Sequence, residues 1–300
     1  MPKDPTNATL VERVPIHEDL ALFRIRYNDH DVPAFEPGQF ATLGLPAPAP
    51  EDGAAARPAR PGRGPRLVRR AYSIASPATE RERLEFYIVR VNEGKLTPSL
   101  WEVSPGDKLF MNERLGGHFV LPWAGAGAGA DDPGAVGDGA ESAGSAEGAA
   151  TPDDARRTFV MVGTGTGLAP FRSMYLTYRH EDRWDKFVLM DGCRVAKDLG
   201  YYQEFTELAA ADERLVYLPT VTREPTESSW PGLRGRVNRL LEAETFRELT
   251  GAALDPVTCH VYLCGNPAMI DQVEADLTQR GFVTQDRKHP EGSLHFERYW

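Results

Sequence analysis

The stretch TFVMVGTGTGLAP, Thr158–Pro170, indicates the fold of the second half of the chain. Its first residues form a continuous apolar run, which is typical of a strand buried on both faces. Glycines follow at positions 163, 165 and 167, where the chain can turn tightly and approach a ligand closely. A helix expected from Leu168 directs its N-terminus at this turn, which favours a phosphate group. The motif predicts a nucleotide site; the alternative is a strand-to-helix turn that only needs glycine.

The same order of strand, turn and helix repeats along the rest of the chain. No Gly-Lys-Ser/Thr follows the glycines, so a P-loop is excluded, and Leu168 replaces the third glycine of GxGxxG. The repeats predict a parallel sheet covered by helices, a Rossmann-like α/β domain over 156–300, with ligands beyond the carboxyl ends of the strands. The predicted strand and helix pairs are KFVLMDG with QEFTELAA, RLVYLPTV with RVNRLLEAE, and CHVYLCG with PAMIDQVEADLTQR.

The N-terminal part, residues 1–123, has a different texture. Short segments rich in β-branched and aromatic residues alternate with turn signals such as EPGQ, SPGD and LGG, which predicts a small antiparallel β-barrel. One helix is expected at TPSLWEV, where Thr97 is a candidate N-cap and Pro98 suits the first helical position. The predicted strands are LALFRIRY, GQFATLGL, RRAYSIAS, LEFYIVRV, DKLFMN and HFVL.

An acidic segment separates the two predicted domains. Residues 124–155 consist mostly of Ala and Gly, with seven acids and no base, so most of the net charge of −10 arises there. Such a composition cannot bury enough apolar surface to form a core, and we predict a disordered insertion. The Pro- and Arg-rich stretch Pro46–Arg66 predicts an extended surface loop.

Polar residues follow the predicted strands at their carboxyl ends. Arg194, Thr222, Arg223 and Arg236 follow two neighbouring strands, and arginine suits an extra phosphate such as the 2′-phosphate of NADP. Surface ion pairing is the alternative for each arginine. Asp191 would instead suggest a ribose contact of NAD. Cys264 ends the last predicted strand as either a reactive-centre or a structural thiol.

The remaining composition narrows the class of protein. No apolar run is long enough for a membrane span, and the N-terminus lacks the apolar core of a secretion signal. Cys193, Cys259 and Cys264 form no CxxC pair, which suits a reducing compartment without disulfides or a cysteine-ligated metal. We expect a cytoplasmic monomer that contains no metal and binds no nucleic acid.

The motifs taken together resemble a known family. The Arg-x-Tyr-Ser motif of RRAYSIAS, with EFYIVRV before GKLTPSL, then GTGTGLAP, CGNPAM and a terminal Tyr-Trp, is similar to the ferredoxin/flavodoxin–NADP(+) reductases of the bacterial type. The resemblance extends from about Thr9 to Trp300 outside the two soft stretches. It implies a barrel domain that binds FAD non-covalently and a sheet domain that binds NADP(H).

The resemblance also implies roles on the flavin side. Arg70 would pair with the pyrophosphate, Tyr72 would stack on the isoalloxazine and Ser73 would bond near N5, with Ala71 between them. Ser73, Cys264 and Trp300 are the residues expected at the reacting centre. Further flavin contacts are expected from Tyr87, Ile88, Val89, Lys95, Leu96 and Thr97.

On the nicotinamide side, Thr164 would lie where the two cofactors meet. Arg194, Thr222, Arg223 and Arg236 would bind the adenosine end of NADP. The remaining residues implied on this side are Gly165, Thr166, Gly265, Asn266 and Pro267, with Tyr299 and Trp300 at the tail.

The aromatic end HFERYW needs a partner, since an aromatic ring in water gains nothing. The resemblance implies that Trp300 stacks on the isoalloxazine or on the adenine, and the alternative is a plug between domains. Hydride transfer from nicotinamide C4 to flavin N5 and delivery of single electrons to ferredoxin or flavodoxin is the implied activity. The alternatives are a reductase that serves an oxygenase through a separate carrier and a non-enzymatic FAD- and NADP-binding sensor.

Overall fold

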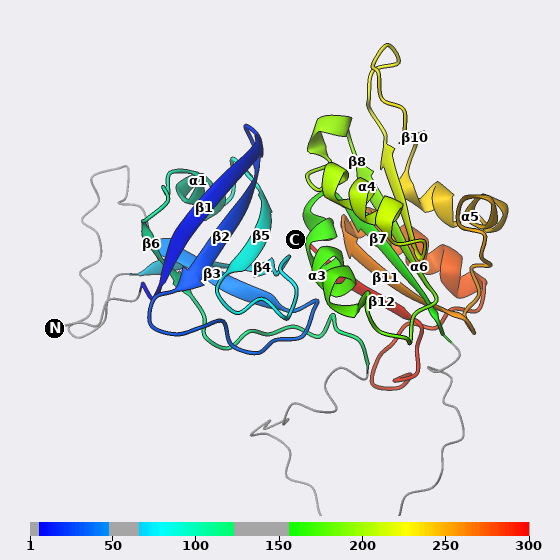
Figure 1. The fold of residues 1–300 in the computed structure, drawn as a ribbon, viewed down its shortest axis with the longest axis horizontal. Helices are drawn as coiled ribbons and strands as arrows, with labels where there is room; N and C mark the ends of the chain where they lie inside the picture. The colour runs from blue at the N-terminus through cyan, green and yellow to red at the C-terminus, as the bar shows by residue number, and fades with distance from the viewer. Residues whose placement is uncertain (1–5, 48–65, 123–155, 300) are drawn as a thin grey trace, which may run out of the picture.

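The computed structural model describes residues 6–47, 66–122 and 156–299, which form two sheets that lie side by side (Figure 1). The N-terminal sheet has six antiparallel strands in the order β4-β3-β6-β1-β2-β5. An antiparallel bridge between Ile74 and Phe86 joins the two edges, which closes the sheet into a barrel. The strands are β1 (Ala8–His17), β2 (Leu20–Tyr27), β3 (Phe40–Pro46), β4 (Leu67–Ser73), β5 (Leu84–Val89) and β6 (Lys108–Met111).

The interior of the barrel is filled by alternate residues of these strands. Phe23 and Ile25 of β2, Leu43 of β3 and Phe86 of β5 are fully buried in one cluster. The short helix α1 (Thr97–Trp101) adds Leu100 to that cluster. This is the period-two burial expected of strands with one face toward a core.

The C-terminal sheet has six parallel strands in the order β10-β9-β8-β7-β11-β12. The order reverses at β7, with β8 on one side and β11 on the other, so that the carboxyl ends of β7 and β11 flank a topological switch point. The strands are β7 (Thr158–Thr164), β8 (Lys186–Cys193), β9 (Leu215–Val221), β10 (Leu233–Arg234), β11 (Cys259–Gly265) and β12 (Leu294–Arg298).

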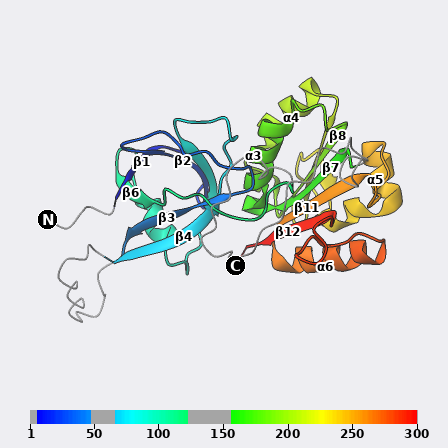
Figure 2. The same cartoon turned by 90° about the horizontal axis from the view of Figure 1, so that it is seen from below.

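Helices cover both faces of this sheet, as Figure 2 shows. Phe159 and Met161 of β7 face one cluster with α3 (Leu168–Tyr178) and α4 (Tyr202–Ala211). Val160 and Val162 face a second cluster on the opposite side. That side is covered by the 3₁₀-helix η4 (Val237–Leu241) and by α5 (Ala243–Thr250) and α6 (Pro267–Gln279); the shorter 3₁₀-helices are η2 (Gly165–Gly167) and η3 (Ala196–Asp198).

The predicted two-part fold is confirmed, with corrections to single elements. HFVL, residues 118–121, forms no strand, whereas β1, β10 and β12 were not predicted. The segment RVNRLLEAE forms a 3₁₀-helix followed by the start of α5 rather than one α-helix. Thr97 is not the N-cap, because Leu96 holds that position and the Thr97 hydroxyl bonds to Val91 instead. The predictions for residues 124–155 and for most of Pro46–Arg66 lie outside the described residues.

The two sheets share a packed boundary. Leu20, Leu22 and Tyr87 of the barrel belong to the same buried cluster as Phe171 and Tyr201 of the other part. The hydroxyl of Tyr262 on β11 donates to the carbonyl of Val120, and the amide of Ala78 donates to Thr177 on α3. Contacts of this kind hold the barrel against α3 and the face of the parallel sheet that α3 covers.

Candidate functional site

A cleft of about 450 Å³ lies where the barrel meets the carboxyl edge of the parallel sheet. Its walls come from segments far apart in sequence: β4 and β5, the turn before α1, the loop before α3, and the end of β12. The lining residues are Phe40, Arg70, Ala71, Tyr72, Ser73, Tyr87, Ile88, Val89, Val91, Gly94, Lys95, Leu96, Thr97, Thr166, Ala169, Glu297, Arg298 and Tyr299.

The end of β4 supplies the polar and aromatic wall of the cleft. Tyr72 is half-buried against the barrel core, and burial raises the pKa of its hydroxyl to about 12. Arg70 is exposed, and its guanidinium donates to the carbonyl of Arg69 at 2.7 Å. These positions leave an aromatic face and a cation at the same wall.

Tyr87 lines the cleft only in part, because its side chain extends to the parallel-sheet part of the molecule. The hydroxyl donates to the carbonyl of Asp198 at 2.9 Å and accepts from the amide of Gly200 at 3.0 Å. Its ring meets the edge of Tyr201, with 5.1 Å between centroids. Tyr87 therefore joins the two parts of the molecule, while Ile88 and Val89 continue the wall of the cleft.

The turn before α1 closes one end of the cleft. The Thr97 hydroxyl accepts from the amide of Val91 and donates to its carbonyl, so it is fully used within the turn. Lys95 is exposed, and the first amides of a helix have no partner within that helix. This end offers a cation and backbone donors, rather than the Thr97 side chain, to an anionic group.

The loop after β7 packs directly on the end of β11. A Cβ on Gly167 would lie 2.4 Å from the carbonyl oxygen of Cys264, so only glycine allows this approach. A Cβ on Gly265, where φ is +127°, would lie 2.3 Å from the hydroxyl of Thr164. The glycines of both predicted motifs thus bring two neighbouring strand ends into contact.

The start of α6 confirms the predicted turn at Asn266 and Pro267. Pro267 is the first residue of the helix, and the Asn266 side chain caps it by accepting from the amides of Ala268 and Met269. The amide of Asn266 donates to the Thr164 hydroxyl at 2.9 Å. Thr164, Gly265, Asn266 and Pro267 are therefore neighbours at the switch point of the sheet.

Three side chains, Ser73, Glu297 and Tyr299, meet at the floor of the cleft, and Cys264 lies buried behind them. The Ser73 hydroxyl donates to a carboxylate oxygen of Glu297 at 3.0 Å and accepts from the Tyr299 hydroxyl at 2.9 Å. The Cys264 thiol is fully buried and lies 4.0 Å from the same oxygen of Glu297. Burial raises the pKa of Glu297, of Tyr299 and of Cys264. The Glu297 carboxyl, the Tyr299 hydroxyl and the Cys264 thiol are therefore biased toward their protonated forms.

Strand β12 explains how the tail reaches this floor. It pairs in parallel with β11, with Cys264 opposite Glu297 and Gly265 opposite Arg298, so its carboxyl end arrives at the same edge. The amide of Tyr299 then donates to the carbonyl of Gly265. Glu297 was not among the predicted residues, since a single glutamate near an aromatic end has no local signature. Trp300 lies outside the described residues.

The predicted arginines gather at the ends of β8, β9 and β10. The amide of Arg223 donates to the carbonyl of Arg194 at 2.7 Å, and the amide of Thr222 donates to Cys193. Arg236 follows two residues after β10. All three arginines are exposed, and within the described ranges their guanidinium groups form no hydrogen bond or ion pair. The alternative of surface ion pairing thus finds no support at these positions.

Asp191 does not fit the suggestion of a ribose contact. Its side chain is fully buried and accepts from the Tyr217 hydroxyl at 3.1 Å, with the Cys193 thiol 3.9 Å away. Burial raises its pKa to about 7. The alternation of β8 places this carboxyl on a covered face of the sheet beside Tyr217, rather than at the edge where a ligand would bind.

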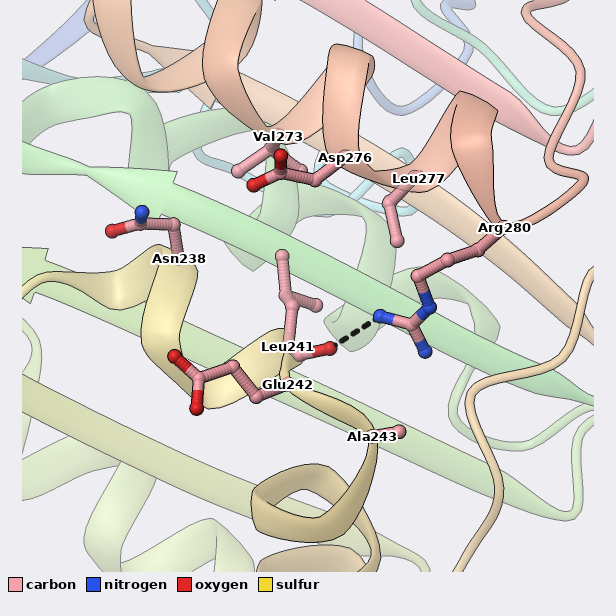
Figure 3. Close-up of a pocket in the computed structure, with 8 residues that line it drawn as sticks. All are labelled: Asn238, Leu241, Glu242, Ala243, Val273, Asp276, Leu277 and Arg280. Atoms are coloured by element: carbon pink, nitrogen blue, oxygen red, sulfur yellow. Dashed lines mark hydrogen bonds between the residues drawn. The ribbon is translucent and has the colours of Figure 1, made fainter.

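A second hollow lies between η4, the start of α5 and the second half of α6 (Figure 3). Arg280 donates there to the carbonyls of Leu241 and Leu254. It contains none of the predicted site residues. Across residues 6–47, 66–122 and 156–299 there is no cluster of ligands for a metal ion, and no helix suited to cross a membrane.

Curated proteins named ferredoxin–NADP reductase are similar to this chain over most of its length. Residues 161–275 match the family model described as the oxidoreductase NAD-binding domain. The ferredoxin–NADP reductase A of Sorangium cellulosum is 31% identical over 230 residues, 74% of this chain and 70% of that protein. The ferredoxin–NADP reductase of Azotobacter vinelandii is 29% identical over 293 residues, 94% and 93% of the two chains.

Among solved structures, the fold is similar to that of a ferredoxin NADP+ reductase from Neisseria gonorrhoeae with bound FAD and NADP. The TM-score is 0.74 at 19% identity, and the match covers 99% of this chain and 100% of the other. At this identity the likeness concerns the fold, which is shared from the barrel to the parallel sheet.

Proposed function

The chain belongs to the ferredoxin–NADP reductase family, and from this premise we propose that it uses FAD to transfer electrons between NADP(H) and a small one-electron carrier. The carrier is ferredoxin, flavodoxin or both, as the names of the relatives indicate. We assign FAD binding to residues 1–123 and NADP binding to residues 156–300, on either side of the acidic segment 124–155.

The cleft carries this proposal, because its residues fit a bound FAD. Tyr72 offers a flat face, Arg70 and Lys95 offer positive charge, and the turn before α1 offers backbone amides. A Cβ on Gly94 would lie 2.7 Å from the Thr97 hydroxyl, so this turn has no room for a side chain at position 94. When bound, the flavin supplies the redox chemistry, taking a hydride from nicotinamide and releasing electrons singly.

The floor of the cleft serves proton balance and positioning. Ser73 presents its hydroxyl between Glu297 and Tyr299, so its orientation is held from both sides. Because the pKa of Glu297 is raised by burial, its carboxyl retains a proton to a higher pH than an exposed glutamate would. We propose that Ser73 and Cys264 act beside the reacting atoms and that Glu297, whose Oε2 accepts from Ser73, holds a proton next to them.

The three exposed arginines support a preference for NADP(H) over NAD(H). Arg194, Arg223 and Arg236 lie at neighbouring strand ends with their guanidinium groups unpaired within the described ranges. A 2′-phosphate would satisfy such groups by charge-assisted bonds. Thr222 lies beside them, while Asp191, the residue that would have argued for NAD, is buried away from the edge.

Arg223→Ala tests this preference. Each charge-assisted bond contributes roughly 1.5 to 3 kcal/mol, so we expect the KM for NADPH to rise about 10-fold or more while the KM for NADH changes little. The matched control is Arg247→Ala, because Arg247 is also exposed but lies in the last turn of α5, away from the ends of β8, β9 and β10. Equal losses with both nucleotides would remove Arg223 from the phosphate site.

The electron carrier is proposed to approach near β4. Arg66 and Arg69 are exposed there, beside the Arg70 assigned to the flavin, and a basic face suits an acidic carrier despite the acidic net charge. Titration of the purified protein with ferredoxin and with flavodoxin, while NADPH oxidation is followed, identifies the carrier. A carrier that serves an oxygenase is the alternative outcome. The cytoplasmic location and the monomeric state stay predictions.

The tail is proposed to gate the cleft. The Tyr299 amide donates to the Gly265 carbonyl, which supports a role for Trp300 against the flavin or its adenine. Deletion of Trp300 is then expected to alter nicotinamide binding and the flavin fluorescence, with little loss of stability.

Flavin content tests the proposal as a whole. We expect the purified protein to be yellow, with one FAD per chain, and to reduce a dye with NADPH. A folded protein that stays colourless after addition of FAD contradicts the function. FAD binding without NADPH-dependent dye reduction would instead support the sensor alternative.

A further inference from the structure

Arg172, on the second turn of α3, reaches across the boundary to the barrel. Its Nη1 donates to the carbonyl of Ala75 at 2.9 Å and lies 3.2 Å from a carboxylate oxygen of Glu85. Ala75 is two residues beyond Ser73, and Glu85 is on β5 two residues before Tyr87. One guanidinium therefore contacts both barrel segments that continue into the wall of the cleft.

The other side of the same guanidinium is held by α4. Nε and Nη2 donate to the two carboxylate oxygens of Glu204, both at 2.8 Å, in a bidentate pair. The ring of Tyr201 lies 4.8 Å from the guanidinium carbon, and the Tyr201 hydroxyl donates to Glu85 at 2.9 Å. The guanidinium is thus held from two sides, by Glu204 on α4 and by Ala75 and Glu85 on the barrel.

These contacts are shielded from solvent. The side chains of Arg172 and Glu85 are 15% and 8% exposed, and Arg24 on β2 holds the second oxygen of Glu85 at 2.6 Å. A charged network of this kind is rigid when all of its members are paired. It also cannot slide, because each bond depends on the fixed geometry of the guanidinium.

The helix that contains Arg172, α3, follows directly after the loop that lines the other side of the cleft. Thr166 and Ala169 line the cleft, and α3 begins at Leu168, directly after Gly167. We propose that Arg172 is a positioning residue that fixes the nicotinamide side of the cleft relative to the flavin side. This inference rests on the proposed function, since it concerns the alignment of the two cofactors assigned there.

Alignment matters because transfer between two bound groups depends steeply on their separation. A misplacement of about 1 Å can lower the rate on the order of 100-fold. Without Arg172, α3 would keep its contacts with the parallel sheet but lose its bond to Ala75 and its ion pair to Glu85. The flavin wall would remain intact, since Glu85 keeps Arg24 and Tyr201.

The test separates the two half-reactions of the FAD-loaded protein. The rate of flavin reduction by saturating NADPH is measured by rapid mixing. For Arg172→Met we expect this rate to fall about 10- to 100-fold. Reoxidation of the reduced flavin by ferricyanide needs no nicotinamide and should stay within about 2-fold. FAD content should be retained, and amide hydrogen exchange should accelerate in residues 74–78.

The matched control is Arg157→Met. Arg157 forms a bidentate pair with Asp185 at 2.7 Å for both bonds and donates to the carbonyl of Asp182, and both partners belong to the parallel-sheet part. We expect its flavin reduction and the exchange of residues 74–78 to equal those of the wild type. Arg172→Lys keeps the charge without the fork, so it should recover only part of the reduction rate.

The outcomes that overturn the proposal are distinct. A wild-type reduction rate in Arg172→Met, or equal slowing of both half-reactions, assigns Arg172 to stability alone. If that variant does not fold, Glu204→Gln decides, with an expected slowing of about 3- to 10-fold; a wild-type rate there overturns the inference. A wild-type protein that binds no FAD, or is not reduced by NADPH, refutes the proposed function itself.

Discussion

At the scale of single residues, Asp191 shows how a position in a strand decides a chemical role. It lies within the buried part of β8, on the face that packs on α3 and α4, and it bonds to Tyr217 rather than to solvent. Burial raises its pKa to about 7, so the folded protein keeps the proton in a range where the unfolded chain has lost it. The carboxyl therefore makes the stability depend on pH.

The substitution Asp191→Asn tests this dependence. A raised folded-state pKa stabilises the fold below the unfolded pKa of about 4, and that contribution is lost as the pH rises toward 7. The difference of about 3 units corresponds to roughly 4 kcal/mol. We expect the free energy of unfolding of the variant, relative to that of the wild type, to rise between pH 4 and 7. Above pH 7 this difference should stay constant.

Urea denaturation at several pH values measures both curves. Asp29→Asn, at an exposed position, is the control and should run parallel to the wild type. Parallel curves for Asp191→Asn as well would show that the buried carboxyl titrates in the same way in both states.

At the scale of elements, a strand can be predicted from sequence when its own residues stabilise it. A strand that depends on pairing with a neighbour is harder to predict. β7, β8 and β11 are continuous apolar runs between turn signals, and their sequences predict them. β12 has no such run, because its strand form comes from pairing with β11 rather than from its own residues. β1 contains Pro15 and is half-buried along most of its length, which hides its pattern.

The same distinction applies to the site. Motif residues such as Tyr72, Ser73 and Thr166 could be predicted, because each lies in a local signature. Glu297 could not, because only the pairing of β12 brings it to Ser73. Arg172 belongs to a helix whose sequence gives no sign that its partners lie on the barrel.

The loop after β7 packs so closely on the end of β11 that one added methyl group should disturb it. Gly167→Ala adds a methyl group where backbone atoms of Cys264 and Gly265 lie 2.4 to 3.0 Å away, and backbone cannot move aside as a side chain can. We expect a loss of about 1 to 3 kcal/mol in stability and weaker NADPH binding, with FAD content retained.

Thermal unfolding and NADPH titration measure the two effects. Gly116→Ala is the control, since the nearest atom to its added Cβ would be 4.0 Å away on Phe40. NADPH binding and stability as in the wild type for Gly167→Ala would mean that the loop does not need its close approach to β11.

At the scale of the whole molecule, stability in acid reflects a buried pair of histidines. His260 on β11 and His295 on β12 are almost fully buried, and burial lowers their pKa values to about 2 and about 3. The unfolded chain takes up both protons near pH 6.5, so the fold loses stability as the pH falls below that value. The loss is about 1.4 kcal/mol per pH unit for each histidine.

His295→Gln should therefore reduce the slope of stability against pH by about one proton between pH 4 and 6. His289→Gln, an exposed position, should leave the slope unchanged. Asp191 acts in the opposite direction over part of this range, so the comparison of variants, rather than the wild-type curve alone, reports on the histidines. An unchanged slope in His295→Gln would show that the folded protein also protonates this residue.

The pairing of β12 with β11 has a consequence for biosynthesis. Ser73 and its partner Glu297 are separated by 224 residues, so the ribosome adds the second wall of the cleft long after the first. At about 5 to 20 residues per second this interval is roughly 10 to 45 seconds. During that time the emerging barrel presents an open half-cleft to its surroundings. The barrel residues that line the cleft, from Phe40 to Thr97, are therefore made long before the tail residues that complete it.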